Sequence, residues 1–324
     1  MSALICDLCP KHCRIEEGMA GDCRARYNYK GVLTAITHDR PVAVHNDPIE
    51  KKPLYHVLPG SKILSIACAG CNLHCLNCQN EGISQSNPVD LKAYRLTADE
   101  IAALALKKGS RSIALTYTDP VIFYEYSLEI GKVARKNNLL TVWVTAGYIN
   151  KKPLEEALPF IDAVNLDIKF MNDDLYRRIC TGTLKPVLEA AQILLKGGKW
   201  LEITNLIIPE LNDSEKDIGK LINFIKTHLG THIPIHFSRF FPHHRMRNVE
   251  PTPESTILKA AALATDAGMK YVYTGNIRGQ NAHATTKCPR CHSSLIERRG
   301  YHIVKNAVIN GKCMSCNETI HGLW

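Results

Sequence analysis

The stretch that decides the fold is the apolar run Ile63-Leu-Ser-Ile-Ala67, followed closely by Cys71-Asn-Leu-His-Cys75-Leu-Asn-Cys78. A short apolar run is typical of a buried strand, and the cysteines after it have the spacing C-x3-C-x2-C. Three thiolates are one fewer than the four that complete a cubane iron–sulfur cluster, so one iron would keep an open position. The alternative is a structural zinc site that takes Cys68 or His74 as its fourth ligand. The spacing, placed directly after a strand, favours the open cluster.

Strands and helices alternate along the chain after this stretch. Thr97 and Glu100 form a capping box that predicts a helix through Lys108, and Asp213 or Ser214 begins another. Such alternation predicts parallel strands joined by right-handed crossovers. We therefore expect an α/β fold built as a partial or complete (β/α) barrel, with functional residues at the carboxyl ends of its strands. The further strands are expected at 112–116, 139–145, 163–168, 201–208, 233–237 and 271–274.

Of the 13 cysteines in the 324-residue chain, 11 fall in three clusters, which suggest a division into three parts. Residues 1–58 are expected to form an N-terminal module with four cysteines and a hairpin over Gly31 to Val44. Residues 59–280 would form the barrel, and residues 281–324 a C-terminal four-cysteine module like a zinc ribbon. A module of the latter size needs a metal or docking to hold a core.

The composition excludes several classes of protein. Apolar residues make up 45% and charged residues 22% of the chain, as in ordinary globular proteins. Neither a membrane helix nor a secretory signal is evident, so we expect a cytoplasmic protein with no membrane association. Cysteines clustered in a reducing compartment indicate metal ligands rather than disulfides. The net charge of +9 is compatible with an acidic partner such as nucleic acid, and the loop His243-His-Arg-Met-Arg247 is a candidate for such contact.

The two outer cysteine groups differ in spacing. The C-terminal group has two C-x2-C pairs, and four thiolates arranged in this way suit zinc, with iron as the alternative. The N-terminal group has the spacing C-x2-C-x3-C-x9-C, which fits either zinc or an additional iron–sulfur cluster. The ligands would be Cys288, Cys291, Cys313 and Cys316 in the first group and Cys6, Cys9, Cys13 and Cys23 in the second. Cys68 and Cys180 are interpreted as buried small hydrophobes.

The central cysteine motif resembles that of the radical SAM superfamily. The resemblance implies a [4Fe-4S] cluster on Cys71, Cys75 and Cys78, whose open iron binds S-adenosylmethionine (SAM). It also implies reductive cleavage of SAM to a 5′-deoxyadenosyl radical and a reductant such as flavodoxin or ferredoxin. The aromatic residue common before the last cysteine is replaced by Asn77.

Further resemblance is to the activases of glycyl radical enzymes, and it implies which residues contact SAM. These are Thr118 and Asp119 in the segment Thr116-Tyr-Thr-Asp-Pro120, Asp167 and Lys169 after the next strand but one, and His236. The arginine that activases carry on the strand before this histidine has no counterpart, since Glu202 or Thr204 stands in its neighbourhood.

Over nearly its whole length the chain is similar to one branch of the superfamily, the radical SAM protein of the AmmeMemoRadiSam system. The shared features include Asp47-Pro-Ile-Glu-Lys-Lys-Pro53 and Tyr117-Thr-Asp-Pro120. This similarity implies AMMECR-like and Memo-like proteins as partners, and it leaves the substrate unidentified, with RNA and a partner protein both open. One alternative is an activase of a glycyl radical enzyme. Another is a non-catalytic zinc protein that binds nucleic acid or protein.

Overall fold

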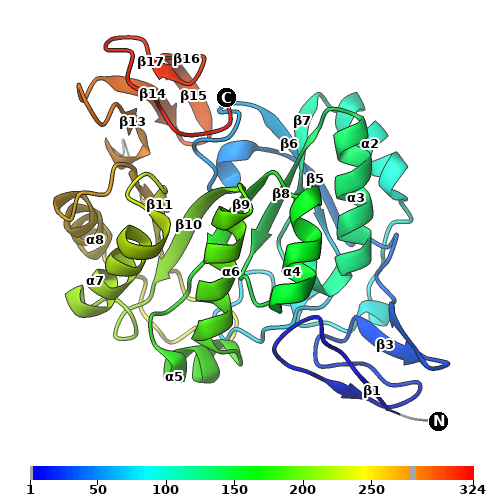
Figure 1. Cartoon of the computed structure of the whole chain (residues 1–324). Helices are drawn as coiled ribbons and strands as arrows, with labels where there is room; N and C mark the ends of the chain where they lie inside the picture. The colour runs from blue at the N-terminus through cyan, green and yellow to red at the C-terminus, as the bar shows by residue number, and fades with distance from the viewer. Residues whose placement is uncertain (1–2, 278–281) are drawn as a thin grey trace.

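A computed structural model describes residues 3–277 and 282–324, within which eight strands form one curved sheet (Figure 1). Strands β6 to β12 run parallel in chain order, and β5 pairs antiparallel with β6 at one edge. The strands are β5 (Ala43–Pro48), β6 (Lys62–Ala67), β7 (Ser110–Leu115), β8 (Leu140–Thr145), β9 (Ala163–Asp167), β10 (Trp200–Ile207), β11 (Ile235–Arg239) and β12 (Val272–Gly275). All seven strands expected from the apolar runs are present, with shifts of one or two residues at their ends.

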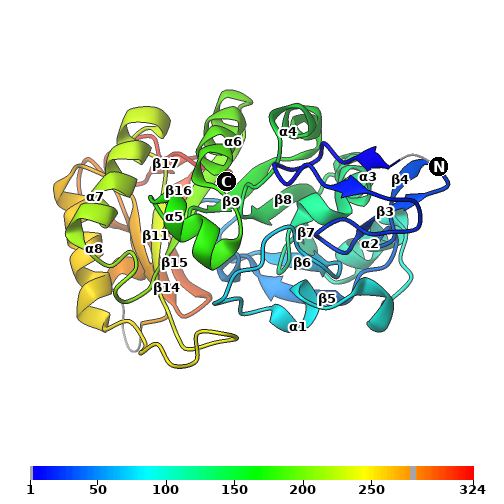
Figure 2. The same cartoon turned by 90° about the horizontal axis from the view of Figure 1, so that it is seen from below.

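Helices cover one face of this sheet, as the view from below shows (Figure 2). The long ones are α2 (Ala98–Lys107), α3 (Tyr124–Lys136), α4 (Lys151–Ala157), α6 (Leu184–Lys196), α7 (Glu215–Phe224) and α8 (Glu254–Asp266). Short ones are α1 (Glu81–Ser84), α5 (Asp173–Leu175), the 3-10 turns η1 (Ile49–Lys51), η2 (Pro88–Asp90), η3 (Pro120–Phe123), η4 (Leu158–Phe160) and η7 (Ala282–Ala284), and the π-helical turns η5 (Tyr176–Cys180) and η6 (Ile225–Leu229). No helix in the described ranges has both the length and the apolar character needed to cross a bilayer.

The sheet is an open barrel, because its order begins at β5 and ends at β12 without pairing these two edges among the described residues. This confirms the partial-barrel form of the prediction. The capping box predicted for α2 is also present: the Glu100 amide donates to Thr97 Oγ1 at 3.3 Å, and Glu100 Oε2 accepts from the Thr97 amide at 2.8 Å. Ser214 caps α7, where its side chain accepts from the Asp217 amide.

The N-terminal residues form two small hairpins, β1 (Leu4–Ile5) with β2 (Arg14–Ile15) and β3 (Arg26–Tyr29) with β4 (Val32–Ala35). The expected hairpin over Gly31 to Val44 is therefore wrong in its placement. Lys30 and Gly31 both have positive φ, 52° and 77°, which is the conformation of a two-residue hairpin turn, so Gly31 lies at the tip and not at the start. The residues after β4 lead into β5 of the central sheet.

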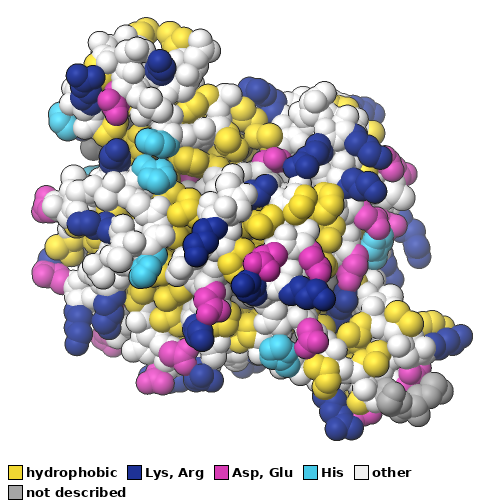
Figure 3. Space-filling model, viewed as in Figure 1, with side chains coloured by type: hydrophobic (Ala, Val, Ile, Leu, Met, Phe, Trp, Pro, Cys, Tyr) yellow, Lys and Arg dark blue, Asp and Glu magenta, His cyan; other side chains and the backbone are white. Residues whose placement is uncertain are grey.

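The C-terminal residues form a separate module that stands out from the barrel at the upper left of Figure 3. It contains β13 (Thr286–Lys287), β14 (Ser294–Arg299), β15 (His302–Asn306), β16 (Val308–Ile309) and β17 (Lys312–Cys313). Its small core includes Leu295 and Ile320 and continues into Tyr271 and Tyr273 of the barrel. The expected boundary between residues 280 and 281 lies outside the described residues. On the face shown in Figure 3, acidic and basic side chains are interspersed.

Candidate functional site

The three central cysteines lie at the carboxyl end of β6 and line a cavity of 1220 Å³ inside the open barrel. The structure contains groups of possible metal ligands whose atoms all lie within 4.8 Å of one another. Among the described residues, none of these groups includes the three motif thiols, Cys68 or His74. Cys68 instead donates to the Thr37 carbonyl oxygen at 3.3 Å, and the His74 ring hydrogen-bonds Asp22 and Gln85. The thiols of Cys71, Cys75 and Cys78 are therefore too far apart to bind a single zinc ion together. Their separation fits a larger inorganic group held by all three.

A row of polar residues crosses the sheet at one level, and Asp167, Thr204 and His236 of this row line the cavity. Register pairs Asp167 on β9 with Thr204 on β10, Thr204 with His236 on β11, and His236 with Tyr273 on β12. Lys169 follows β9, and its Nζ lies 3.1 Å from Asp167 Oδ2. Although burial opposes it, the Asp167 carboxylate raises the pKa of Lys169 well above its usual value. An ammonium and a carboxylate are thus held at the cavity wall together.

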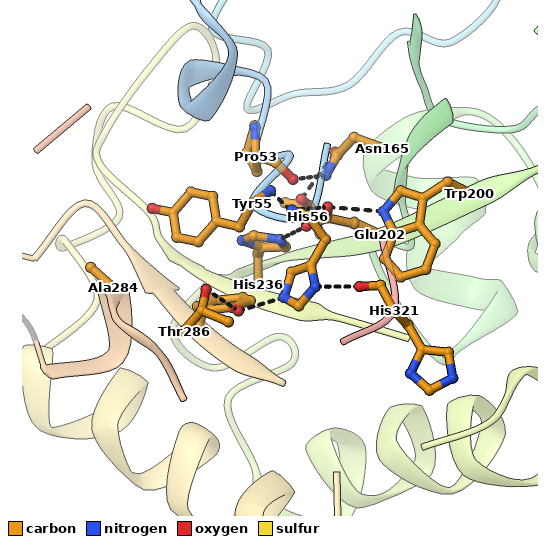
Figure 4. Close-up of polar contacts among 12 residues, drawn as sticks. Pro53, Tyr55, His56, Asn165, Trp200, Glu202, His236, Ala284, Thr286 and His321 are labelled. Atoms are coloured by element: carbon orange, nitrogen blue, oxygen red, sulfur yellow. Dashed lines mark hydrogen bonds and ion pairs between the residues drawn. The ribbon is translucent and has the colours of Figure 1, made fainter. Parts of the chain in front are cut away.

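Glu202 hydrogen-bonds His236, one of the residues that line the cavity (Figure 4). Its Oε2 lies 2.7 Å from His236 Nε2, and its two oxygens also accept from the backbone amides of Tyr55 and His56 at 3.0 and 2.8 Å. Trp200 Nε1 donates to the same carboxylate. Despite the opposing effect of burial, the hydrogen bond with His236 lowers the pKa of Glu202. Glu202 stands in the neighbourhood where activases carry an arginine. Both oxygens of its carboxylate accept hydrogen bonds.

The segment after β7 also reaches the cavity. Thr118 Oγ1 donates to the Cys68 carbonyl oxygen at 2.8 Å, and the Tyr117 carbonyl oxygen accepts from Asn80 Nδ2 at 2.7 Å. The Asp119 carboxylate accepts from Thr145 Oγ1 and from the backbone amides of Ala146 and Val121. Burial raises the pKa of Asp119 to about 6 in spite of these bonds. Asp119 therefore fixes the segment between β7 and β8, and it lines the cavity.

Cys180 is a neighbour of the cysteine motif that the sequence did not identify. Its thiol is a neighbour of the Cys75 thiol, its carbonyl oxygen accepts from the His74 amide at 3.1 Å, and it is fully buried. The hydrogen bond from Cys180, with the Lys169 ammonium and against burial, lowers the pKa of Cys75 to about 7. The sequence interpreted both Cys180 and Cys68 as buried small hydrophobes. This describes Cys68 correctly, but for Cys180 it accounts for the burial and not for the contact with Cys75.

The C-terminal module forms part of the cavity wall. Arg298 of β14 donates to the Tyr55 carbonyl oxygen at 2.7 Å and to Thr286 Oγ1 at 2.9 Å, and it stacks 4.1 Å from the Tyr55 ring centroid. Glu297, Arg299 and Tyr301 line the same cavity as the three central cysteines. No motif in the sequence indicated that the C-terminal module reaches the cavity, because Arg298 and Tyr55 are far apart in the chain.

The outer cysteine groups differ in geometry. The ligand atoms of Cys288, Cys291, Cys313 and Cys316 all lie within 4.8 Å of one another, with Sγ–Sγ distances of 3.5 Å for Cys288–Cys316 and 3.7 Å for Cys291–Cys313. The N-terminal four line one small cavity but do not meet that limit among the described residues.

The basic loop after β11 packs on the cysteine motif. The Arg245 amide donates to the Leu76 carbonyl oxygen at 2.9 Å, and His243 Nε2 lies 2.7 Å from Glu81 Oε2. His244 and Arg245 share a surface hollow with Arg24 and His74.

Comparisons with known proteins agree with this geometry. The model of the radical SAM superfamily matches residues 65–225. An uncharacterised protein of Methanocaldococcus jannaschii, MJ0808, is 42% identical over 97% of this chain and 94% of its own length. Pyruvate formate-lyase-activating enzyme of Clostridium pasteurianum is 29% identical over 48% of this chain and 66% of that enzyme.

Solved structures share the fold. A radical SAM methyltransferase from Sphaerobacter thermophilus superposes with a TM-score of 0.52 at 14% identity, covering 69% of this chain and 68% of that one. Streptococcus suis SuiB bound to S-adenosylmethionine also gives 0.52, at 13% identity, covering 71% and 53%.

Proposed function

Because the chain belongs to the radical SAM superfamily, we propose that it reductively cleaves SAM to form a 5′-deoxyadenosyl radical that abstracts a hydrogen atom from a substrate. The observation that carries the proposal is one cavity, of 1220 Å³, which is lined by the three motif cysteines and by every residue expected to contact SAM.

The motif cysteines fit the cluster that the superfamily uses. Their thiols face the cavity, they are spread too widely for a single metal ion, and three ligands leave one iron open. When bound there, the [4Fe-4S] cluster would supply the electron that splits the sulfonium bond of SAM.

The chain's own residues would bind and orient the methionine end of SAM. The Lys169 ammonium suits a carboxylate, and the Asp167 carboxylate suits an ammonium group. The carbonyl oxygens of the segment through Thr118 and Asp119 would accept hydrogen bonds from the SAM amino group. Glu202 would keep Nε2 of His236 engaged, so that the opposite edge of the imidazole faces SAM.

The substrate would occupy the remaining cavity between SAM and residues 297–301 of the C-terminal module. Similarity to activases supports a second candidate, hydrogen abstraction from a glycine of a partner enzyme. RNA as a substrate and AMMECR-like and Memo-like partners stay predictions. A cytoplasmic location with flavodoxin or ferredoxin as reductant belongs to the same proposal.

The C-terminal cysteines would hold one zinc ion. A tetrahedral site with Zn–S bonds of about 2.3 Å separates its sulfur atoms by about 3.8 Å. The Sγ distances of 3.5 and 3.7 Å are close to this value.

The test is formation of 5′-deoxyadenosine from SAM by the anaerobically reconstituted, dithionite-reduced protein. We expect product from the wild type and from Cys68→Ala, whose thiol bonds the Thr37 carbonyl oxygen. Cys75→Ala should lose at least about 99% of it, because the cluster loses a ligand. Full activity in Cys75→Ala would disprove the assignment of the cluster. A glycine-centred radical formed in a candidate partner enzyme would select the activase alternative.

A further inference from the structure

A basic hollow of 300 Å³ adjoins the loop that carries the catalytic cysteines, and it is separate from the main cavity. Its walls come from the N-terminal module, from the cysteine motif with the short helix after it, and from the loop after β11. The residues that line it are Arg24, His74, Gln85, His244 and Arg245. Leu73 and Cys75, on either side of His74, line the main cavity instead. The cysteine loop therefore has the main cavity on one side and the basic hollow on the other.

Two guanidinium groups and two imidazoles line the basic hollow, and among the described residues no carboxylate does. Arg24 donates only to neutral acceptors there, the Ser84 carbonyl oxygen at 2.8 Å and Gln85 Oε1 at 3.4 Å, and its Nε is buried without a partner. The Arg245 side chain is exposed. The positive charge of these two side chains is therefore not neutralised within the hollow.

Two acidic residues adjoin the basic hollow, and each is already paired with basic groups. Asp22 Oδ2 lies 2.9 Å from His74 Nε2 and 3.0 Å from Lys11 Nζ. Glu81 Oε2 lies 2.7 Å from His243 Nε2. Because these carboxylates are engaged at the edge of the hollow, its field stays positive, and a positive surface attracts a partner with acidic side chains.

The basic hollow lies within one residue of a proposed ligand of the catalytic cluster. His74 directly precedes Cys75, and its amide donates to the Cys180 carbonyl oxygen at 3.1 Å. On the other side of that cysteine, the Leu76 carbonyl oxygen accepts from the Arg245 amide at 2.9 Å. A protein bound over the hollow would therefore lie against the loop that carries the three thiolates, with only this loop between it and the main cavity.

We infer that the basic hollow is the docking site of the electron donor, an acidic protein that carries a flavin or an iron–sulfur cluster. The inference rests on the proposed function, because reductive cleavage of SAM requires one electron from outside the chain. That electron leaves the donor, which is oxidised, and enters the catalytic cluster, which is reduced. Complementary surface charges speed association more than they strengthen it, and this suits a carrier that must leave after each transfer.

The experiment measures the Kd between the full chain and a flavodoxin or a ferredoxin of negative net charge, without SAM and at increasing salt concentration. Arg245→Glu should raise the Kd at least about tenfold at low salt, and the difference should shrink as salt screens the charges. Arg111→Glu is the matched control, because it makes the same change of charge at an exposed position. Arg111 lies near the start of β7, whereas the cysteine loop follows the opposite end of the parallel strand β6. Its Kd should stay close to that of the wild type.

A second readout is the rate at which the reduced donor is oxidised by the chain, followed by stopped-flow absorbance. Arg245→Glu should slow this step at least about tenfold at low salt, whereas dithionite, a small reductant that needs no docking surface, should reduce the variant and the wild type alike. Equal Kd values for Arg245→Glu and the wild type would overturn the inference. So would a wild type that binds an RNA hairpin and neither donor protein. A wild type that binds the donor with this charge dependence and cleaves no SAM would refute the proposed function alone.

Discussion

At the scale of single residues, the thiol of Cys180 is the contact with the clearest consequence for the chemistry. It lies beside Cys75 at the end of the π-helical turn η5, and its interaction with Cys75 is the main cause that lowers the pKa of that thiol to about 7. Hydrogen bonds to cluster sulfurs favour the reduced, more negative state and so raise the potential. We expect Cys180→Ala to keep its iron and to lower the midpoint potential by about 40 mV, equivalent to about 1 kcal/mol for one electron.

Redox titration followed by electron paramagnetic resonance measures this shift. Cys180→Ser keeps a donor and is expected to shift less than Cys180→Ala, and Cys68→Ala serves as the control that leaves the potential unchanged. Loss of iron from Cys180→Ala would show instead that Cys180 contributes to cluster assembly.

The residues of the site were predictable where the chemistry is local. The spacing of the three motif cysteines was enough to place them together, and the ends of the strands were enough to place Asp167 and His236 on the same cavity. Cys180 was missed because its approach to Cys75 depends on how η5 packs on the cysteine loop. Glu202 was noted in place of an arginine, but its bonds to two backbone amides could not be read from the sequence.

At the scale of elements, we expect the C-terminal module to depend on the zinc ion proposed for it. Cys316→Ala removes one of the four proposed ligands, and a module with so small a core is expected to need the ion to hold its fold. We expect loss of about one zinc ion per chain and of about 3 kcal/mol or more of the module's unfolding free energy.

Met314 provides the matched control, because it lies in the same loop and its side chain is 63% exposed. Met314→Ala should keep the zinc ion and the stability, as measured by metal analysis and by limited proteolysis of the module. Equal proteolysis of the two variants would contradict a structural role for the metal.

The elements themselves were predictable to different degrees. The seven parallel strands were found because each contains consecutive buried residues, whereas β5, which was not expected, has two exposed residues among its six. The hairpin near Gly31 was misplaced because a glycine marks a turn without showing which strands it joins, and the true partners are Arg26–Tyr29 and Val32–Ala35. Apolar periodicity is weak in these short, partly exposed strands.

At the scale of the whole molecule, the docking of the two terminal modules was beyond sequence reasoning. It depends on contacts between distant residues, such as Arg298 with Tyr55 and Gly70 with Cys23. Such contacts have no spacing rule in the chain. The modules were visible as cysteine clusters, whereas their positions at the cavity and at the catalytic loop required the folded chain.

His56 joins three parts of the molecule and makes its stability depend on pH. Its ring nitrogens bond the His321 carbonyl oxygen at 2.7 Å and the Tyr273 hydroxyl at 2.6 Å, and burial lowers its pKa from 6.5 to about 4. His56 therefore takes up a proton below pH 6.5 in the unfolded chain, but only below about pH 4 in the folded chain. The stability conferred by neutral His56 is complete above pH 6.5 and is lost as the pH falls toward 4, at about 1.4 kcal/mol per pH unit.

We expect this residue to account for about 2 kcal/mol of the fall in unfolding free energy between about pH 7 and about pH 5. The measurement is urea unfolding at both pH values, for the wild type, His56→Gln and the exposed-site control His302→Gln. His56→Gln is expected to be less stable at the higher pH, because it packs less well in a fully buried site, and to lose less stability on acidification. Other titrating groups, including the metal-binding thiols, are common to all three proteins and cancel in the comparison. The same pH dependence in His56→Gln and in the wild type would show that the buried imidazole is not the group that couples protonation to the docking of the C-terminal module.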